Sequence, residues 1–374
     1  MAKTKSAAKH TADEKPSGNG GRRTFGTADA GSGETALEGL SRERLQEMLY
    51  QMLLGRRFEE KTAEAYAIGK IGGFCHLYIG QEAVAVGALE PLRREDYVIS
   101  AYRSHVQALV KGITPRAVMA ELYGRIDGCS GGKGGSMHLY SAEDNFMGGW
   151  GIVGGQIPLA TGFGWAIKYR GGDQVCICFM GEAAVNQGAF HESLNMAALW
   201  KLPVIFIVEN NRFGMGTAWE RASSLYDISQ KANAYDMPSA VADGMDVLDM
   251  RRVVKDAVDR ARQDKTPTLI EARCYRFMGH SMSDPVHGVY RTKEEVEEHK
   301  EKDPIRRFIE QLQDAELITE DELQAIDKRV HDEADDAADF ADQSAEPGVE
   351  ELYRHVYAEE DVNGRLFFDR KNRL

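Results

Sequence analysis

The middle of the chain alternates short apolar runs with longer stretches of helical spacing. Runs rich in β-branched and apolar residues occupy positions 97–100, 175–180, 204–209 and 268–276. Such runs, when helical segments separate them, are typical of parallel strands joined by crossover helices. The pattern therefore predicts an α/β fold, in which helices cover both faces of a parallel sheet.

Helical patterns also flank this region. Leucine and methionine residues recur at helical spacing between positions 37 and 64, which predicts an amphipathic helix leading into the folded region. After Tyr290 the chain becomes helical and acidic. Thr292 and Thr319 each precede a glutamate by three residues, and this capping-box pattern predicts two helix starts. The acidic run at 332–342 is expected on a solvated helix face.

These patterns divide the chain into four parts. Residues 1–35 are expected to form a disordered tail, 36–290 the α/β domain, 291–345 helices that pack on the same domain, and 346–374 a C-terminal extension. The tail is rich in Lys, Ser, Ala, Thr and Gly and lacks a large apolar cluster, so burial cannot offset the entropy cost of ordering it. A transit peptide is the alternative interpretation, which the acidic residues of the tail disfavour.

Composition excludes several classes of protein. The formal net charge of -13 argues against a nucleic-acid-binding protein, which needs a basic surface. No apolar run approaches the roughly 20 residues of a membrane span, so no membrane insertion is expected. The five cysteines are an odd number in a chain without a secretory signal, which indicates a reducing compartment. Cys176 and Cys178 lack a second pair for zinc and are interpreted as buried small hydrophobes.

Two polar residues follow neighbouring predicted strands. The strand at 175–180 is followed by Glu182 and by a helix expected to start around Ala184; the strand at 204–209 is followed by Asn211. A strand–helix–strand unit of this kind brings both side chains to one carboxyl edge of the sheet. A carboxylate and an amide oxygen suit Mg²⁺, and a helix start there favours a diphosphate. From the residues alone, a plain surface loop with an Asn-Asn turn remains an alternative.

Two glycine patterns point away from other nucleotide-binding classes. The run GCSGGKGG at 128–135 is not a P-loop, because Lys133 is not followed by Ser or Thr at the required spacing. It is interpreted as a tight, close-packed loop. A Rossmann dehydrogenase is disfavoured because no GxGxxG motif opens a βα unit.

From about residue 37 to residue 342 the chain resembles the alpha subunits of pyruvate dehydrogenase. The likeness is carried by GFCHLYIGQEAVAVG, AYRSHV, GGKGGSMH, GIVGGQIPLATG, NMAALWKLP, ENNRFGMGT and GHSMSDP. The resemblance implies a thiamine diphosphate-binding fold, thiamine diphosphate and Mg²⁺ as cofactors, and oxidative decarboxylation of pyruvate. One departure stands out: the family's Gly-Asp-Gly is here Gly181-Glu182-Ala183, so a slightly shifted loop is expected.

The resemblance also implies roles for individual residues. Mg²⁺ would be bound by Glu182, Asn211 and the backbone carbonyl of Phe213. The catalytic residues would be His76, facing substrate or intermediate, and His280, which also contacts the diphosphate. The cofactor would further contact Tyr102, Arg103, Gly151, Val153, Gly154, Ala183 and Ala184, together with Glu182 and Asn211.

The resemblance implies partners as well. The glutamate that activates the cofactor's aminopyrimidine ring would come from a beta subunit, so this chain alone would be inert and an α2β2 heterotetramer is expected. The acetyl group would pass to the lipoyl domain of a dihydrolipoyl acetyltransferase. Two alternatives stay open. One is a branched-chain 2-oxo acid or acetoin dehydrogenase alpha subunit; the other is a non-catalytic assembly subunit, suggested by Glu182 and Ala183.

GHSMSDP and the following YRT resemble a loop that kinases phosphorylate in mitochondrial relatives, with Ser281 at the regulated position. The intervening VHGV at 286–289 is one residue longer than usual and lacks the second serine. A bacterial, cytoplasmic enzyme without kinase control is therefore expected, in preference to a mitochondrial matrix enzyme. The loop from Ser281 to Tyr290 is expected to stay disordered until cofactor binds.

Overall fold

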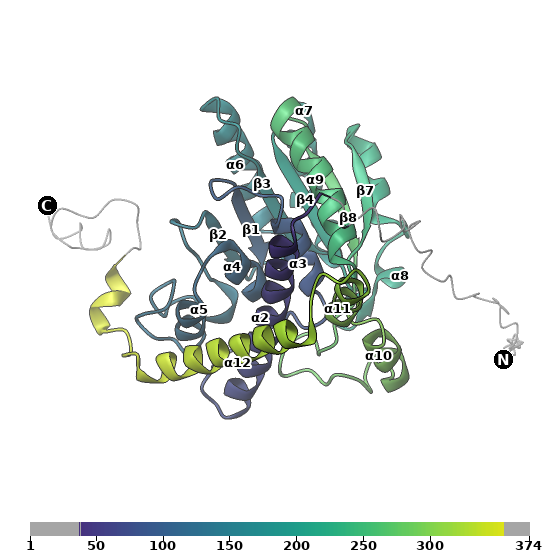
Figure 1. Ribbon diagram of the computed structural model, residues 1–374. Helices are drawn as coiled ribbons and strands as arrows, with labels where there is room; N and C mark the ends of the chain where they lie inside the picture. Colours follow the sequence, from purple (N-terminus) through teal and green to yellow (C-terminus); the bar gives the residue numbers. More distant parts are fainter. Residues whose placement is uncertain (1–36, 38, 355–374) are drawn as a thin grey trace, which may run out of the picture.

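A six-stranded parallel sheet lies at the centre of the protein in a computed structural model that describes residue 37 and residues 39–354 (Figure 1). The tail expected at 1–35 and residues 355–374 of the expected extension lie outside the described residues. The strands run, in order across the sheet, β2 (Phe146–Trp150), β1 (Tyr97–Ala101), β3 (Cys176–Gly181), β4 (Val204–Asn210), β8 (Thr268–Arg273) and β7 (Ser239–Asp243). The prediction of a parallel α/β sheet is confirmed.

Helices cover both faces of this sheet, because the buried side chains of its central strands alternate between two apolar clusters. Ile205 and Ile207 of β4 belong to the cluster that includes α4 (His105–Lys111) and α9 (Val247–Asp264). Val204, Phe206 and Val208 belong to the cluster on the other face, under α6 (Gln156–Tyr169) and α7 (Gly188–Leu199). Cys176 and Cys178 lie buried in this second cluster, as small apolar side chains.

The two edge strands were not expected from the sequence. β2 has the sequence FMGGW and β7 the sequence SAVAD, so neither contains the run of large β-branched residues that marks the central strands. Both lie at the ends of the sheet, where one strand neighbour suffices. Weak strand propensity is tolerated there because pairing with β1 or β8 supplies the backbone hydrogen bonds.

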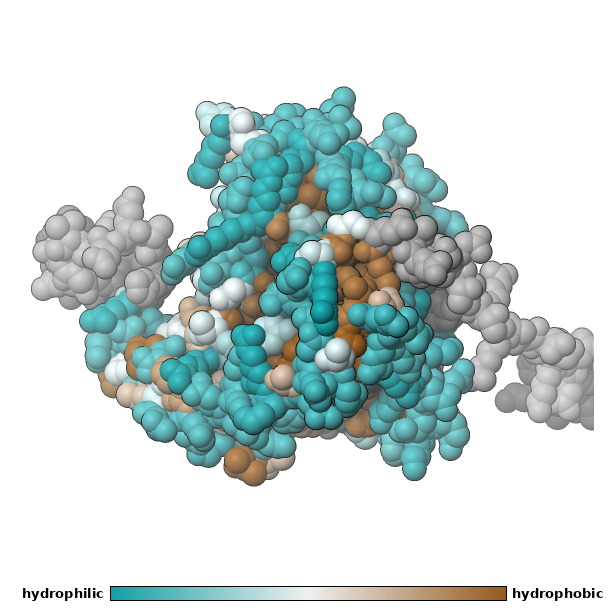
Figure 2. Space-filling model, in the orientation of Figure 1, coloured by the Kyte–Doolittle hydropathy of each residue, from teal (hydrophilic) through white to brown (hydrophobic). Residues whose placement is uncertain are grey.

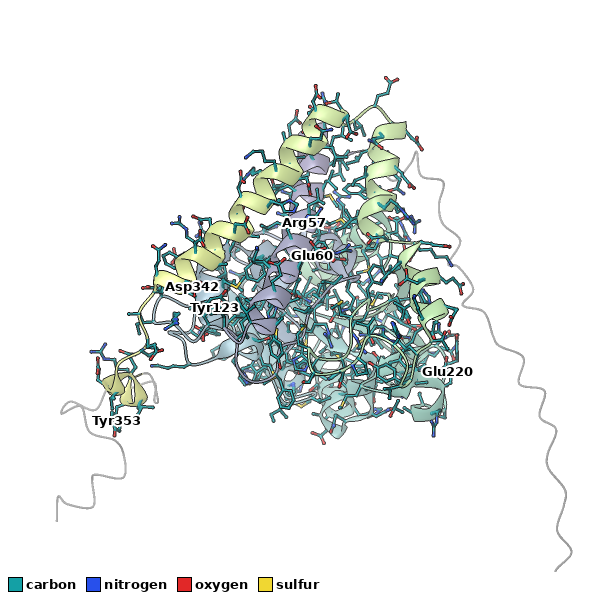
Figure 3. The ribbon with its side chains drawn as sticks, turned by 90° about the horizontal axis from the view of Figure 1, so that it is seen from below. Arg57, Glu60, Tyr123, Glu220, Asp342 and Tyr353 are labelled. Atoms are coloured by element: carbon teal, nitrogen blue, oxygen red, sulfur yellow. The ribbon has the colours of Figure 1, made fainter. Side chains whose placement is uncertain are left out.

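Capping residues set the bounds of the terminal helices. The expected N-terminal helix is α2 (Arg42–Ala67); it begins at Arg42 because the Ser41 side chain accepts a hydrogen bond from the Arg44 N–H. The two predicted capping sites are confirmed: Thr292 caps α10 (Lys293–Lys300), and Thr319 forms a full capping box at the start of α12 (Glu320–Gln343). Figure 3 shows α12 lying across α2, where Arg57 pairs with Asp327 at 2.9 Å.

The remaining elements are short. They are α3 (Glu82–Leu89), α5 (Pro115–Leu122), α8 (Trp219–Ala222), α11 (Pro304–Asp314), the hairpin of β5 (Phe213–Gly214) and β6 (Thr217–Ala218), and the 3-10 turns η1 (Gly135–Met137), η2 (Glu182–Asn186), η3 (Ile228–Tyr235) and η4 (Val349–Tyr353). Within α12, Ala334, Ala337 and Ala341 are buried, whereas most of the acidic side chains between them are exposed, as predicted.

The surface of the protein separates hydrophilic from apolar residues. The face in Figure 2 is mostly hydrophilic, with apolar atoms gathered near its centre, where α3 and α11 lie in Figure 1. Across the described residues, none of the helices is both long and apolar enough to cross a membrane.

Candidate active site

The carboxyl ends of β3 and β4 bring the predicted metal ligands together. The two strands pair in parallel, with Gly181 opposite Glu209, so Glu182 and Asn211 both emerge at the same edge of the sheet. Both side chains are buried, Glu182 to 2% exposure. Arg212, between Asn211 and Phe213, has a left-handed backbone with φ of 75°, which turns the chain sharply after the strand.

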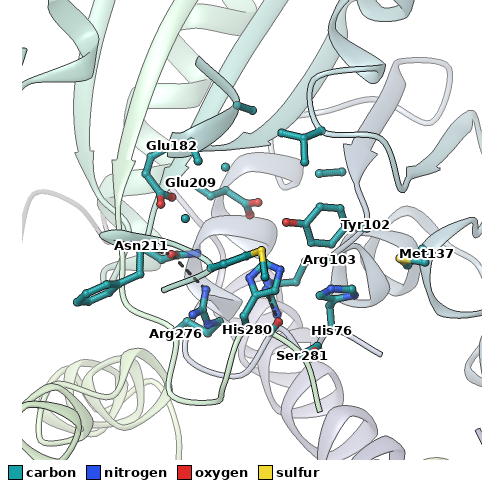
Figure 4. Close-up of a pocket in the computed structure, with 18 of the residues that line it drawn as sticks. His76, Tyr102, Arg103, Met137, Glu182, Glu209, Asn211, Arg276, His280 and Ser281 are labelled. Carbon is teal, nitrogen blue, oxygen red and sulfur yellow. Dashed lines mark hydrogen bonds between the residues drawn. The ribbon is translucent and has the colours of Figure 1, made fainter. Parts of the chain in front are cut away.

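These ends open into a cavity of about 780 Å³ (Figure 4). Every site residue expected from the sequence lines it: His76, Tyr102, Arg103, Gly151, Val153, Gly154, Glu182, Ala183, Ala184, Asn211, Phe213 and His280. The lining also includes residues that the sequence reasoning missed, namely Gln81, Gln156, Glu209 and Arg276. Six separate segments of the sequence thus converge on one site.

Several buried polar atoms in this cavity have no hydrogen-bond partner among the described residues. They are His76 Nδ1, Gln81 Nε2, Gln156 Oε1, Glu182 Oε1 and His280 Nδ1. Buried polar groups are normally paired, because leaving one unpaired costs about 1–3 kcal/mol. A cluster of unpaired donors and acceptors around one cavity indicates that a polar ligand completes their bonding.

The two carboxyl groups at the strand ends are held in an unusual electrostatic state. Burial raises the pKa of Glu182 to about 7, opposed by backbone hydrogen bonds and by the positive charges of Arg276 and Arg103. Burial likewise raises the pKa of Glu209 to about 7, opposed by its hydrogen bond from Tyr78. A bound cation would favour the ionised carboxylate, so both groups are suited to a site that acquires positive charge.

Three aromatic rings meet in the wall of the cavity. The ring of His76 lies 4.4 Å from that of Tyr102 and 5.1 Å from that of His280, measured between centroids. Burial, with Arg103 as the next cause, lowers the pKa of His76 to about 2 and that of His280 to about 4. Both imidazoles are therefore neutral near pH 7, and each can donate a hydrogen bond from one ring nitrogen and accept with the other.

Two arginines tie the cavity wall together. Arg103 donates to the backbone carbonyls of Leu77 and His280, each at 2.7 Å, and so anchors the histidine-bearing segment. Arg276 donates to the Asn211 Oδ1 at 3.4 Å and to the Tyr290 hydroxyl at 3.1 Å. The sequence reasoning placed Arg276 inside a strand. That strand ends at Arg273, so Arg276 lies just past the strand end, at the ligand-binding edge of the sheet. A basic residue at such a position was the feature of the sequence that could have indicated a site residue.

The helix after Glu182 differs from its prediction. The segment from Glu182 to Asn186 is a 3-10 turn, and α7 begins only at Gly188. The prediction of an α-helix from Ala184 was therefore wrong, because Gln187 adopts an extended backbone conformation that separates the two helical segments. Ala183 is not among the residues with positive φ, so its side chain is accommodated without left-handed strain.

The glycine-rich loop at 128–135 is closed on itself. The buried carboxylate of Glu121 accepts backbone hydrogen bonds from Ser130 and Gly132 through Oε2, and from Gly134 and Gly135 through Oε1. The N–H groups that could cradle a phosphate are thus occupied by a protein carboxylate. The interpretation as a tight structural loop agrees with this geometry.

The segment from Ser281 to Tyr290 closes one side of the cavity. Ser281 is buried and its hydroxyl lies 3.2 Å from that of Ser283. Arg291 donates to the carbonyls of Met278 and Val286, which ties both ends of the loop to one guanidinium group. Whether this loop is ordered without cofactor stays a prediction.

Comparison with known proteins agrees with this geometry. Residues 50–350 match the family model described as the dehydrogenase E1 component. The chain is 52% identical over 307 residues to the pyruvate dehydrogenase E1 component subunit alpha of Rhizobium meliloti, covering 82% of this chain and 88% of that one. It is 45% identical to the protein of the same name from Porphyra purpurea (86% and 94% covered) and 47% identical to that from Zymomonas mobilis (84% and 89% covered).

Proposed function

Because the chain belongs to the dehydrogenase E1 component family, we propose that it is the alpha subunit of a pyruvate dehydrogenase that binds thiamine diphosphate and Mg²⁺. The observation that carries this proposal is the group of unpaired buried polar atoms around a single cavity at the carboxyl ends of β3 and β4. Relatives named as pyruvate dehydrogenases favour pyruvate over a branched-chain 2-oxo acid or acetoin.

The metal would be held at the strand ends. The Glu182 carboxylate, the Asn211 side-chain oxygen and the Phe213 backbone carbonyl offer the hard oxygen ligands that Mg²⁺ prefers, and the diphosphate would complete the set. No cluster of three or more His, Cys, Asp or Glu side chains is arranged for a metal in the described part of the chain. This donor set therefore suits a cation that shares its ligands with a phosphate, and disfavours zinc.

When bound, thiamine diphosphate would supply a carbon nucleophile for the 2-oxo group of pyruvate and an electron sink for its decarboxylation. The residues of this chain position it and move protons. His76 and His280 are neutral near pH 7, so one ring N–H of each can donate a hydrogen bond to a negatively charged oxygen, and the other ring nitrogen can accept a hydrogen bond or take up a proton. Arg103 and Arg276 place positive charge beside the diphosphate.

We propose that a beta subunit completes the site in an α2β2 assembly, and that the lipoyl domain of a dihydrolipoyl acetyltransferase receives the acetyl group. Val153, which lines the cavity, is 43% exposed, and Ile152 next to it in the chain is 76% exposed. Exposed apolar side chains beside a polar cavity favour coverage by a protein partner.

The test is to purify the chain alone and together with a pyruvate dehydrogenase beta subunit from the same organism, and to measure cofactor binding and pyruvate decarboxylation in both. The pair is expected to bind thiamine diphosphate only with Mg²⁺ and to release carbon dioxide from pyruvate faster than from 3-methyl-2-oxobutanoate. The chain alone is expected to be inert. Turnover by the lone chain would contradict the assembly, and absence of cofactor binding by the pair would contradict the proposed function.

A further inference from the structure

Gln81 is a fully buried glutamine at the start of α3 whose side chain lines the cavity. Its Oε1 accepts hydrogen bonds from the Asn211 Nδ2 at 3.1 Å and from the Cys274 Sγ at 3.5 Å. Its Nε2 has no partner among the described residues. The neighbouring carboxylate of Glu82 is no acceptor for this amide, because it is engaged by Arg56 and by the Gly80 N–H.

The bond from Asn211 to Gln81 determines which way both amides face. Because the Asn211 Nδ2 is turned toward Gln81, its Oδ1 is turned toward Arg276 and the Phe213 N–H, each at 3.4 Å. These contacts are long for hydrogen bonds, so they leave the oxygen free to bind a cation. The same pairing directs the NH₂ group of Gln81 away from Asn211.

We propose that Gln81 has two roles: its Oε1 orients Asn211 for the metal, and its Nε2 donates to the diphosphate. This inference rests on the proposed function. A buried amide N–H without an acceptor is unfavourable, and an anionic oxygen beside the metal is the acceptor that the proposed ligand supplies. Gln81 is therefore a binding residue for the diphosphate as well as a positioning residue for Asn211.

Gln156 provides a matched comparison in the same cavity. It is equally buried, but its Nε2 donates to the Phe179 carbonyl at 2.9 Å, so the atom left unpaired is the acceptor Oε1. Because an acceptor gains nothing from a diphosphate anion, this oxygen would serve a donor elsewhere on the cofactor, and the comparison is therefore made with inorganic diphosphate alone. Replacing Gln156 should therefore disturb the cavity about as much as replacing Gln81, but it removes no hydrogen-bond donor to phosphate.

The experiment uses the enzyme assembled with its beta subunit and three variants, Gln81→Glu, Gln81→Met and Gln156→Met. Gln81→Glu keeps an acceptor for Asn211 but replaces the donor with an acceptor. Gln81→Met removes both functions in a side chain of similar shape. The probes are thiamine diphosphate, inorganic diphosphate as its competitor, and Mg²⁺ titrated at saturating thiamine diphosphate, all followed by intrinsic fluorescence.

Gln81→Glu is expected to weaken thiamine diphosphate and inorganic diphosphate by the same factor, about ten- to hundredfold, the range for losing a hydrogen bond to a charged group. Its Mg²⁺ requirement at saturating cofactor should be unchanged or lower. Gln81→Met should weaken the diphosphate and also raise the Mg²⁺ requirement, because Asn211 loses its orientation. Gln156→Met should bind inorganic diphosphate within about twofold of wild type, too small a change for a lost hydrogen bond.

The inference is overturned if Gln81→Glu or, should that variant not fold, Gln81→Met binds inorganic diphosphate as wild type does. It is equally overturned if Gln156→Met weakens this probe as much as the Gln81 variants do, because the effect would then be general damage to the cavity. Failure of the wild-type enzyme to bind thiamine diphosphate with Mg²⁺ would contradict the proposed function instead.

Discussion

Two buried glutamates in this protein lie beside tight backbone turns, yet their surroundings differ. Glu121 accepts four backbone hydrogen bonds from the glycine-rich loop at 128–135, so both its oxygens are fully used. Glu182 is as deeply buried, but its Oε1 has no partner among the described residues, and burial raises its pKa to about 7. The first carboxylate is satisfied by the fold, whereas the second keeps an unpaired oxygen at the cavity, where the proposed metal would bind.

The difference in hydrogen bonding distinguishes a carboxylate that stabilises the fold from one that is suited to bind a ligand. A carboxylate whose charge is compensated by backbone N–H groups stabilises the loop around it. A carboxylate that is compensated only in part, as Glu182 is, destabilises the cofactor-free protein, and this cost is tolerated where binding a cation recovers it. Removal of the charge should therefore have opposite effects on folding at the two positions.

The largest expected effect on folding is at Glu121. Glu121→Gln places an NH₂ group against N–H donors of the loop, and we expect it to lower the free energy of unfolding by roughly 3 kcal/mol, the upper range for unsatisfied buried groups. The urea midpoint measures this. As a control, Ser130→Ala keeps the backbone donors of the same loop and should cost under about 1 kcal/mol. Equal stability of Glu121→Gln and wild type would refute the distinction.

A second prediction concerns the fit of Ala183, the departure from the family pattern. A Cβ on Gly214 would lie 2.6 Å from the Cβ of Ala183, closer than side chains approach, so only one of the two positions can carry a methyl group. Gly214→Ala should cost about 1–3 kcal/mol, the range for overpacking. Combining it with Ala183→Gly should recover most of that loss. A double variant no more stable than Gly214→Ala would show that the two residues do not compete for space.

A third prediction follows from the raised pKa of Glu182. If Glu182 is the proposed ligand, Mg²⁺ binds its ionised carboxylate, and the metal-free group takes up a proton as the pH falls through about 7. Mg²⁺ affinity in the presence of cofactor should therefore weaken roughly tenfold per pH unit below that pKa and level off above it. Titration between pH 8 and pH 6, corrected for proton binding by free cofactor, measures this. A flat profile would mean that Glu182 is ionised without metal.

The smallest expected effect is at Tyr290, which links the loop to Arg276. Tyr290→Phe keeps the ring beside Phe213 but removes the hydroxyl, a change of about 0.5–1.5 kcal/mol. In the presence of cofactor, protease should consequently cleave the loop at 281–289 a few times faster in this variant than in the wild type. Val289→Ala, on the same loop but 76% exposed, is the control and should not change the rate. Equal cleavage rates for the wild type, Tyr290→Phe and Val289→Ala would show that the Tyr290 hydroxyl does not hold the loop in place.

Much of the fold was readable from the sequence because its central strands are apolar on both sides and its terminal helices carry strong caps. The carboxyl-edge placement of Glu182 and Asn211 followed from the handedness of one strand–helix–strand unit. The edge strands β2 and β7 were missed because pairing, and not local propensity, makes them strands. A bacterial, cytoplasmic location stays a prediction.

The site residues that the sequence did not predict were missed for a different reason. Gln81 and Gln156 lie in apolar surroundings where no spacing rule distinguishes a ligand donor from a helix-end glutamine. Glu209 was read only as the last residue of a strand, although its register opposite Gly181 places it at the cavity. Their importance depends on which atoms remain unpaired after folding, and this is a property of the three-dimensional contacts.

The most direct test of the account is the unfolding free energy of Glu182→Gln, with its beta subunit, at pH 8 with and without Mg²⁺ and thiamine diphosphate. The folded-state pKa of Glu182 is raised from 4.5 to about 7, so the cofactor-free wild type loses stability as the pH rises through that window, roughly 3 kcal/mol in total. The neutral glutamine avoids this loss. The variant should therefore be more stable than wild type without cofactor and gain less stability than wild type from adding it; a less stable variant, or one that cofactor stabilises as much as it stabilises wild type, would contradict the account.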